Sequence, residues 1–232
     1  MVGKKKNKQV VLFGSEILIC VLLCIFAVIT FVIFTDLVLG NKFEVIDSKI
    51  QNFFLQNETS FLTKFMFFIS GFGSMIFFFT LSVVFAGYLY IRKKADAFIF
   101  IAIIYSAVVI NIFLKFFYER PRPDLNPLVI ENSYSYPSFH AMGSMVLYFS
   151  IAYFIYRETK SKSLTVILSS LFTLLVLLIG ISSIYLGVHF PSDVIAGFLS
   201  GFIWIMVIVI FQRTIVFENL YNKAIRRKNG SK

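Results

Sequence analysis

The chain contains two histidines, and each lies in a short polar stretch between long apolar runs. His189 opens HFPSD (189–193), so one helical turn would bring the carboxylate of Asp193 to one of its imidazole nitrogens. That contact would fix the tautomer of His189 and leave its other nitrogen as a nucleophile. His140, in YPSFHAMGS (136–144), would then protonate a departing oxygen. The two stretches therefore predict a nucleophile and a general acid.

A third polar stretch, KFFYERPRPD (115–124), supplies positive charge. Its cations are Lys115, Arg120 and Arg122. Ammonium and guanidinium groups together clamp phosphate oxygens. Pro137 and Pro191 suit the first turns of helices, where free N–H groups and the helix dipole also favour an anion. Two histidines, one carboxylate and this cationic cluster predict a metal-free phosphoryl-transfer site.

The elements that position these residues are predicted to be membrane spans. The 232 residues are 58% hydrophobic and only 15% charged, and a soluble domain would not keep so much apolar surface out of water. Apolar runs long enough to span a bilayer lie at about 10–35, 62–91, 96–117, 139–156, 164–186 and 194–212. The connector at 40–60 is amphipathic and predicts a short surface helix. We therefore expect an all-α, polytopic membrane protein with six transmembrane helices and one domain, residues 1–232.

The basic residues indicate an orientation. A net charge of +10 would suggest a nucleic-acid partner if it lined one face, but these residues occur in short blocks between apolar runs, so no nucleic acid is expected. Six of the 22 lysines and arginines lie on one side of the predicted membrane, and the remaining 16 lie on the side of the termini. The six are Lys42, Lys49, Lys64, Lys115, Arg120 and Arg122. This bias predicts cytoplasmic tails at about 1–9 and 213–232 and an extracytoplasmic site. The short tails and loops, without a eukaryotic targeting signal, favour a bacterial plasma membrane.

Two features of the first apolar run have simple interpretations. Cys20 and Cys24 are four residues apart on one helical face, which suits small residues of a span better than a disulfide, with a metal or redox role as the alternative. The run follows a basic N-terminus but is longer than the apolar region of a secretory signal. We therefore expect it to be a retained first span.

Each candidate site residue also has a plainer interpretation. A lone cation near a membrane end often extends its charge to the interface, and a lone histidine at a helix start is usually a satisfied polar residue. Asp193 would also cap the last helix, as would Ser192. The chemical interpretation is favoured because three separate polar stretches are predicted to meet on the same side of the membrane.

The same stretches resemble the three signature motifs of the type-2 phosphatidic acid phosphatase superfamily, which includes membrane lipid phosphatases and vanadium haloperoxidases. The first motif is Lys, six residues and Arg-Pro, and it matches residues 115–123. The second, Pro-Ser-Gly-His, matches PSFH at 137–140. The third is Ser-Arg, five residues, His, three residues and Asp, and it matches SSIYLGVHFPSD at 182–193. With the six-span layout, the resemblance covers most of the chain.

The resemblance implies a phosphohistidine mechanism that needs no metal or other cofactor. His189 would attack phosphorus, Asp193 would orient it, and His140 would protonate the leaving group. The phosphate would be held by Lys115, Arg122, Ser138 and the backbone N–H of Phe139, with Arg120 and Ser183 as further candidates. The implied substrate is a lipid phosphate in the bilayer: phosphatidylglycerophosphate, phosphatidic acid or a polyprenyl diphosphate.

Two positions depart from the family pattern. Phe139 stands where the second motif has glycine, and Ser183 stands where the third has arginine. A charge-assisted contact to a transferring phosphoryl group is worth about 10²–10³ in rate. The alternative function is therefore a catalytically impaired member that binds a phospholipid or a partner protein. A transporter is disfavoured, because transporters place ionisable residues near the midplane and often contain inverted repeats.

Overall fold

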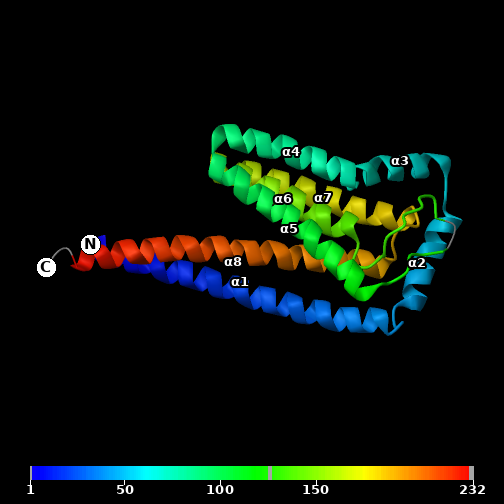
Figure 1. Ribbon diagram of the computed structural model, residues 1–232, viewed down its shortest axis with the longest axis horizontal. Coiled ribbons are helices and arrows are strands. Elements are labelled where there is room, and N and C mark those ends of the chain that lie inside the picture. Colours follow the sequence, from blue (N-terminus) through cyan, green and yellow to red (C-terminus); the bar gives the residue numbers. More distant parts are fainter. Residues whose placement is uncertain (1, 125–126, 230–232) are drawn as a thin grey trace. The chain divides into compact units, whose positions relative to one another are not determined.

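The computed structural model describes residues 2–124 and 127–229, with side chains described for residues 14–124 and 127–214. Within these ranges the chain forms eight helices and no strand (Figure 1). They are α1 (Val2–Leu39), α2 (Glu44–Gln56), α3 (Ser60–Gly71), α4 (Met75–Arg92), α5 (Lys94–Tyr118), α6 (Phe139–Thr159), α7 (Lys162–Tyr185) and α8 (Pro191–Asn229). Six of these, α1 and α4 to α8, are long and apolar enough to cross a membrane. The predicted all-α fold with six transmembrane helices is confirmed.

The described chain divides into two compact units. One contains α1 up to residue 30 and α8 from residue 203, and within it Arg213 lies 3.3 Å from Glu16 in an ion pair. The other contains residues 31–202 and includes both histidines. The segments predicted as tails at 1–9 and 213–232 continue α1 and α8 as far as the structure describes them.

The run at 62–91 was predicted as one span, and this prediction was wrong. The run is divided between α3 and α4, and only α4 is long enough to cross a membrane. The break lies at 71–74, where the Ser74 hydroxyl accepts a hydrogen bond from the N–H of Phe77 (3.3 Å) and starts α4. Gly73 lies so close to α7 that a Cβ atom there would be 2.4 Å from Ile179 Cγ2. This close approach therefore requires glycine.

The helix α6 occupies the centre of the second unit. It contacts α4, α5 and α7. In its most apolar 18-residue stretch 67% of the residues are buried, compared with 11–39% in the other five spans. Phe154 of α6 packs edge-on against Phe100 of α5, with ring centroids 5.7 Å apart. Because α6 faces protein rather than lipid, it tolerates the lowest hydropathy of the six spans.

The short helix predicted after the first span is α2, and it does more than rest on a surface. Its residues Asp47 and Gln51 are buried, and α2 contacts α7. The ring of Phe54 lies 5.8 Å from that of Tyr185, whose hydroxyl is hydrogen-bonded to Thr63 of α3 (2.7 Å). α2 and α3 are therefore fixed against the end of α7, and α2 presents Asp47 to the interior.

The connection between α5 and α6 lies at the same end of this unit as α2 and the α7–α8 junction (Figure 1). Its described part is pinned by Ser135, which donates from its N–H to the Arg120 carbonyl (2.9 Å) and from its hydroxyl to the Pro121 carbonyl (2.8 Å). The buried hydroxyl of Tyr136 is hydrogen-bonded to Thr35 of α1 (2.6 Å). The three polar stretches identified in the sequence therefore meet at one end of the unit.

Candidate active site

His140 and His189 lie beside one another, with ring centroids 5.8 Å apart and ring planes at 69°. Both line a pocket of about 230 Å³, which we call the histidine pocket. Its lining residues are Ser74, Met75, Ile76, Lys115, Glu131, Ser133, Phe139, His140 and His189. His140 lies in the first turn of α6, and His189 precedes the first residue of α8 by two positions. Two helix starts therefore bring the histidines together, although they are far apart in sequence.

His189 is buried and uncharged at neutral pH. Its Nδ1 lies 3.7 Å from Asp193 Oδ2 and has no hydrogen-bond partner among the described residues. Burial is the main cause that lowers the pKa of His189 well below its usual value. The positive charges of Lys115 and Arg122, followed by charge repulsion from His140, lower it further. The imidazole therefore has a free lone pair at neutral pH, as a nucleophile requires.

The carboxylate of Asp193 is held mainly by groups other than His189. Its Oδ2 accepts a hydrogen bond from the N–H of Phe190 (2.9 Å). This is the side-chain-to-backbone bond of a capping box, and it stabilises the start of α8. Its Oδ1 accepts from Arg120 (2.5 Å). The predicted contact with His189, at 3.7 Å, is close but longer than a hydrogen bond.

Arg120, a candidate phosphate ligand in the sequence, is bound instead by protein carboxylates. Its guanidinium donates to Asp47 Oδ2 (2.9 Å) and Asp193 Oδ1 (2.5 Å). It also lies 4.3 Å from the ring centroid of Phe190. Asp47 in turn accepts from the N–H (2.9 Å) and the hydroxyl (2.5 Å) of Ser192. Arg120 and Asp47 therefore tie α2 to the start of α8.

Lys115 lines the histidine pocket, whereas Arg122 is not among the lining residues but donates to two of them, Glu131 and Ser133. Both cations are bonded to the α5–α6 connection. Lys115 Nζ donates to the Tyr134 carbonyl. Arg122 donates from Nε to the Ser133 carbonyl (2.6 Å) and from one terminal nitrogen to the Val188 carbonyl (2.8 Å). Since Val188 precedes His189, Arg122 ties the connection to the backbone beside the nucleophile candidate.

Glu131 is a pocket residue that the sequence analysis did not identify. Its Oε2 accepts from Arg122 (2.5 Å), and it lines the histidine pocket with Lys115 and both histidines. Burial alone would raise the pKa of Glu131. The charge of Arg122, followed by His140, His189 and Lys115, outweighs this and lowers the pKa. An ionised carboxylate, paired with Arg122, therefore lines the pocket.

The two residues that depart from the motif pattern, Phe139 and Ser183, are both buried. The ring of Phe139 packs edge-on against Phe78 of α4, with centroids 5.2 Å apart. It also fills space over Gly143, where a Cβ atom would lie 2.8 Å from its Cζ. The ring is therefore buried in the core beside the pocket, and Gly143 provides the room that Phe139 needs.

The hydroxyls of the two serine candidates form hydrogen bonds within their own helices. Ser138 caps α6 by accepting from the N–H of Ala141 (3.4 Å), and its own N–H donates to the Asp193 carbonyl (3.0 Å). The hydroxyl of Ser183 donates to the Gly180 carbonyl (2.8 Å), and its carbonyl accepts from the N–H of His189 (3.2 Å). Neither residue is among those that line the histidine pocket.

These features define a multi-pass helical membrane protein in which a buried histidine, His189, and a half-buried one, His140, lie beside cationic side chains. Residues 96–217, more than half of the chain, match the model of the PAP2 superfamily, so the chain belongs to this family. The matched region contains Lys115, Arg122, both histidines and Asp193, whereas Asp47 lies outside it. The family predicted from the sequence is confirmed.

A curated protein and a solved structure, both from Bacillus subtilis, are similar to this chain. It is 37% identical over 134 residues to phosphatidylglycerophosphatase B of strain 168, and the match covers 56% of this chain and 64% of that relative. It also resembles the crystal structure of a transmembrane PAP2 type phosphatidylglycerolphosphate phosphatase, with a TM-score of 0.78 and 28% identity over 83% of this chain and 96% of that one.

The crystal structure of Aquifex aeolicus LpxE is also similar. The TM-score is 0.55 and the identity is 26%, over 69% of this chain and 93% of that one. The folds of these solved structures agree with the multi-pass helical architecture described above.

Proposed function

We propose that this protein is an integral-membrane lipid phosphatase that hydrolyses a phosphate monoester or diphosphate through a phosphohistidine intermediate. The proposal depends on one observation. The rings of His140 and His189, with centroids 5.8 Å apart, line the same pocket as Lys115. The names of the Bacillus subtilis relatives make phosphatidylglycerophosphate the first substrate to test. Phosphatidic acid and polyprenyl diphosphates are the next.

In the first chemical step, the free imidazole nitrogen of His189 attacks phosphorus. A P–N bond forms while the P–O bond to the lipid breaks, and protonated His140 gives its proton to the departing oxygen. Lys115 and Arg122 balance the negative charge of the phosphoryl group. Asp193, 3.7 Å from Nδ1, stabilises the positive charge that develops on His189.

In the second step, water hydrolyses the phosphohistidine. His140, now neutral, accepts a proton from the attacking water, the P–N bond breaks, and inorganic phosphate leaves. His189 returns to its neutral form and His140 to its protonated form. The cycle is balanced without a metal ion, so activity is expected to persist in a chelator.

The apolar rim of the histidine pocket supports a lipid as the substrate. Met75 and Ile76 line the pocket at the start of α4, and their exposed fractions are 44% and 83%. Exposed apolar side chains at the end of a span would contact the acyl or prenyl chain while the headgroup enters the pocket. A soluble phosphate ester would gain nothing from this rim.

We also propose that both termini are cytoplasmic and that the histidine pocket is extracytoplasmic, in a bacterial plasma membrane. The charge bias of the sequence supports this orientation. Cysteines placed at Asp124 and Lys160 in a chain without Cys20 and Cys24 test it with a membrane-impermeant maleimide on intact cells. Only the cysteine at 124 should react, and preferential labelling at 160 would reverse the orientation.

The activity test uses purified protein in detergent with a chelator and a panel of lipid monophosphates and diphosphates. We expect release of inorganic phosphate from at least one of them, and a loss of about 10³-fold or more in His189→Ala. Lys42→Gln, which removes an exposed cation outside the pocket, is the matched control and should keep full activity. Equal activity in His189→Ala would refute the proposal.

A non-catalytic lipid-binding protein is the second candidate function, because Ser183 replaces the arginine of the third family motif. Ser183→Arg would restore that charge, and Ser183→Gln adds similar length without it. An enzyme that lacks only this contact should gain about 10-fold or more in rate with arginine and nothing with glutamine. Lipid binding without phosphate release in the native protein and in Ser183→Arg would favour the binding function.

A further inference from the structure

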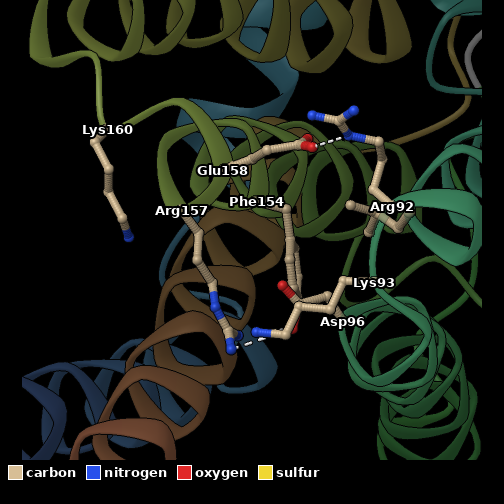
Figure 2. A pocket seen from close by; sticks show the side chains of 8 residues that line it. Arg92, Lys93, Asp96, Phe154, Arg157, Glu158 and Lys160 are labelled. Atoms are coloured by element: carbon tan, nitrogen blue, oxygen red, sulfur yellow. Dashed lines mark hydrogen bonds and ion pairs between the residues drawn. The ribbon is translucent and has the colours of Figure 1, made fainter.

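A second polar pocket lies at the other ends of the helices that form the histidine pocket. Its volume is about 250 Å³, and we call it the basic pocket (Figure 2). It is lined by Leu89, Arg92, Lys93, Asp96, Phe154, Arg157, Glu158 and Lys160. Helix α4 runs from Met75 in the histidine pocket to Arg92 in the basic pocket, and α6 runs from His140 to Arg157. The two pockets therefore lie at opposite ends of the same helices.

We propose that the basic pocket binds the phosphate of an anionic phospholipid headgroup, in the leaflet opposite the histidine pocket. Four cationic and two anionic side chains line it, so it carries an excess of positive charge. It lies where the spans α4 and α6 end, which is the depth of the headgroups. Basic pockets between transmembrane helices are suited to such headgroups.

The two carboxylates hold the arginines in position. Glu158 accepts from Arg92 Nε and from the Tyr88 hydroxyl (2.6 Å). Asp96 Oδ1 lies 3.1 Å from a terminal nitrogen of Arg157 (Figure 2). A guanidinium has five N–H donors, so both arginines keep donors for a ligand beyond these ion pairs. The ion pairs therefore pre-organise the arginines instead of exhausting them.

Among the four cations of the basic pocket, Lys160 is the one without a carboxylate partner among the described residues. Within the described residues it forms no ion pair, and its ammonium lies 5.7 Å from the ring centroid of Tyr156. In Figure 2 its side chain extends along one side of the pocket, apart from the paired arginines. An ammonium without a carboxylate partner is available to a phosphate oxygen at no cost in broken ion pairs.

The start of α5 adds backbone donors to this charge. α5 has 25 residues, and its N-cap residue, Lys93, provides no side-chain hydrogen bond to the first turn. Uncapped N–H groups and the positive end of the helix dipole favour an anion at this position. In addition, the buried Asp96 Oδ1 accepts no hydrogen bond from the described residues, although two cations lie within ion-pair distance. It could accept from a headgroup hydroxyl.

The buried floor of the pocket is apolar. Leu89 and Phe154 are 3% and 1% exposed and line the pocket beneath the charged rim. A headgroup with a glycerol backbone matches this combination of apolar floor and cationic rim better than a free phosphate ion does. This inference does not depend on hydrolysis in the histidine pocket.

The test compares ligand binding to the full chain in detergent, by native mass spectrometry and by the shift in thermal unfolding temperature. The ligands are phosphatidylglycerol, phosphatidylcholine, inorganic phosphate and glycerol phosphate. We expect phosphatidylglycerol to bind and to raise the unfolding temperature, since a ligand that binds only the folded state stabilises it. Stabilisation by the soluble phosphates as well would keep the anion site but assign it to free phosphate.

Matched variants separate the basic pocket from any lipid bound elsewhere. Lys160→Gln and the double variant with Arg157→Gln should each weaken phosphatidylglycerol binding, by about 10-fold for each cation removed. Lys162→Gln removes an exposed cation at the same end of the bundle that does not line the pocket, and should bind normally. Lys160→Gln disturbs no ion pair of the described residues, so it remains informative if the double variant unfolds. Equal binding by Lys160→Gln and Lys162→Gln, or equal binding of phosphatidylglycerol and phosphatidylcholine, would overturn the proposal.

Discussion

The carboxylate of Glu131 lies 2.5 Å from the guanidinium of Arg122, at the edge of the pocket that contains both histidines. An anionic side chain therefore occupies the position where the proposed mechanism requires the charge of a phosphate. A phosphate that enters the pocket must share or displace this ion pair, because two anions compete for the same donors.

We expect Glu131→Gln to bind phosphate more tightly. The amide removes the competing charge but keeps the size of the side chain, so the inhibition constant of inorganic phosphate should fall by about 10-fold. The KM for a lipid phosphate should fall in parallel. Glu58→Gln, at an exposed position outside the pocket, should change neither constant. Weaker phosphate inhibition in Glu131→Gln would show that Glu131 chiefly holds Arg122 in position.

The lowered pKa of His189 predicts how activity and stability depend on pH. The folded protein keeps this imidazole neutral below pH 6.5, where a histidine in the unfolded chain already binds a proton. The nucleophile therefore remains available below that pH, and the folded state loses stability as the pH falls through this range. An NMR titration of the two histidine imidazoles measures the pKa of His189 directly. Removing a nearby charge with Lys115→Gln should raise the pKa of His189, and a shift in the other direction would contradict the electrostatic account.

The ion pair between the buried Asp47 and the half-buried Arg120 predicts a stability effect at a residue, Asp47, that lies far from the family motifs in sequence. Asp47→Asn would leave Arg120 with one carboxylate fewer and weaken the attachment of α2 to Ser192. Breaking a buried ion pair by removing one charge typically costs about 3–5 kcal/mol. The free energy of unfolding should fall by that order, and activity should fall because Arg120 also holds Asp193. Asp124→Asn, at an exposed position, is the control, and equal stability of the two variants would contradict this role.

The close approach at Gly73 predicts a packing effect that a second substitution relieves. In Gly73→Ala the new methyl group would lie 2.4 Å from Ile179 Cγ2 and 3.2 Å from His140 Cδ2. Overpacking of this kind costs about 1–3 kcal/mol, and here it would also displace the proposed general acid. The unfolding temperature and kcat should both fall, and Ile179→Ala in the same chain should restore part of each. No recovery in the double variant would place the strain elsewhere.

The sequence predicted those residues in and beside the pocket that belong to recurring motifs. Lys115, Arg122, His140 and His189 were identified by residue type and spacing, and the structure places all four at one end of the second unit. This was possible because helix starts and span ends are readable from apolar runs.

The sequence did not predict contacts that depend on how distant segments pack. From the sequence, Asp47 belongs to the polar side of an amphipathic helix. No local pattern indicates that its side chain accepts a hydrogen bond from Ser192, 145 positions later. Glu131 lies in a connection without periodicity, so its direction into the pocket has no sequence signal. The break at 71–74 was missed because an apolar run conceals a helix end, although Gly-Phe-Gly-Ser there combines a cap and two glycines.

The central claim is that His189 carries the phosphoryl group during turnover. Rapid quenching with a lipid labelled in its phosphate, followed by peptide analysis under alkaline conditions that preserve phosphohistidine, tests it most directly. The account predicts label on the peptide that contains His189, more of it in His140→Ala if hydrolysis of the intermediate is slowed, and none in His189→Ala. Turnover by the native protein without label on that peptide, or undiminished turnover by His189→Ala, would contradict it.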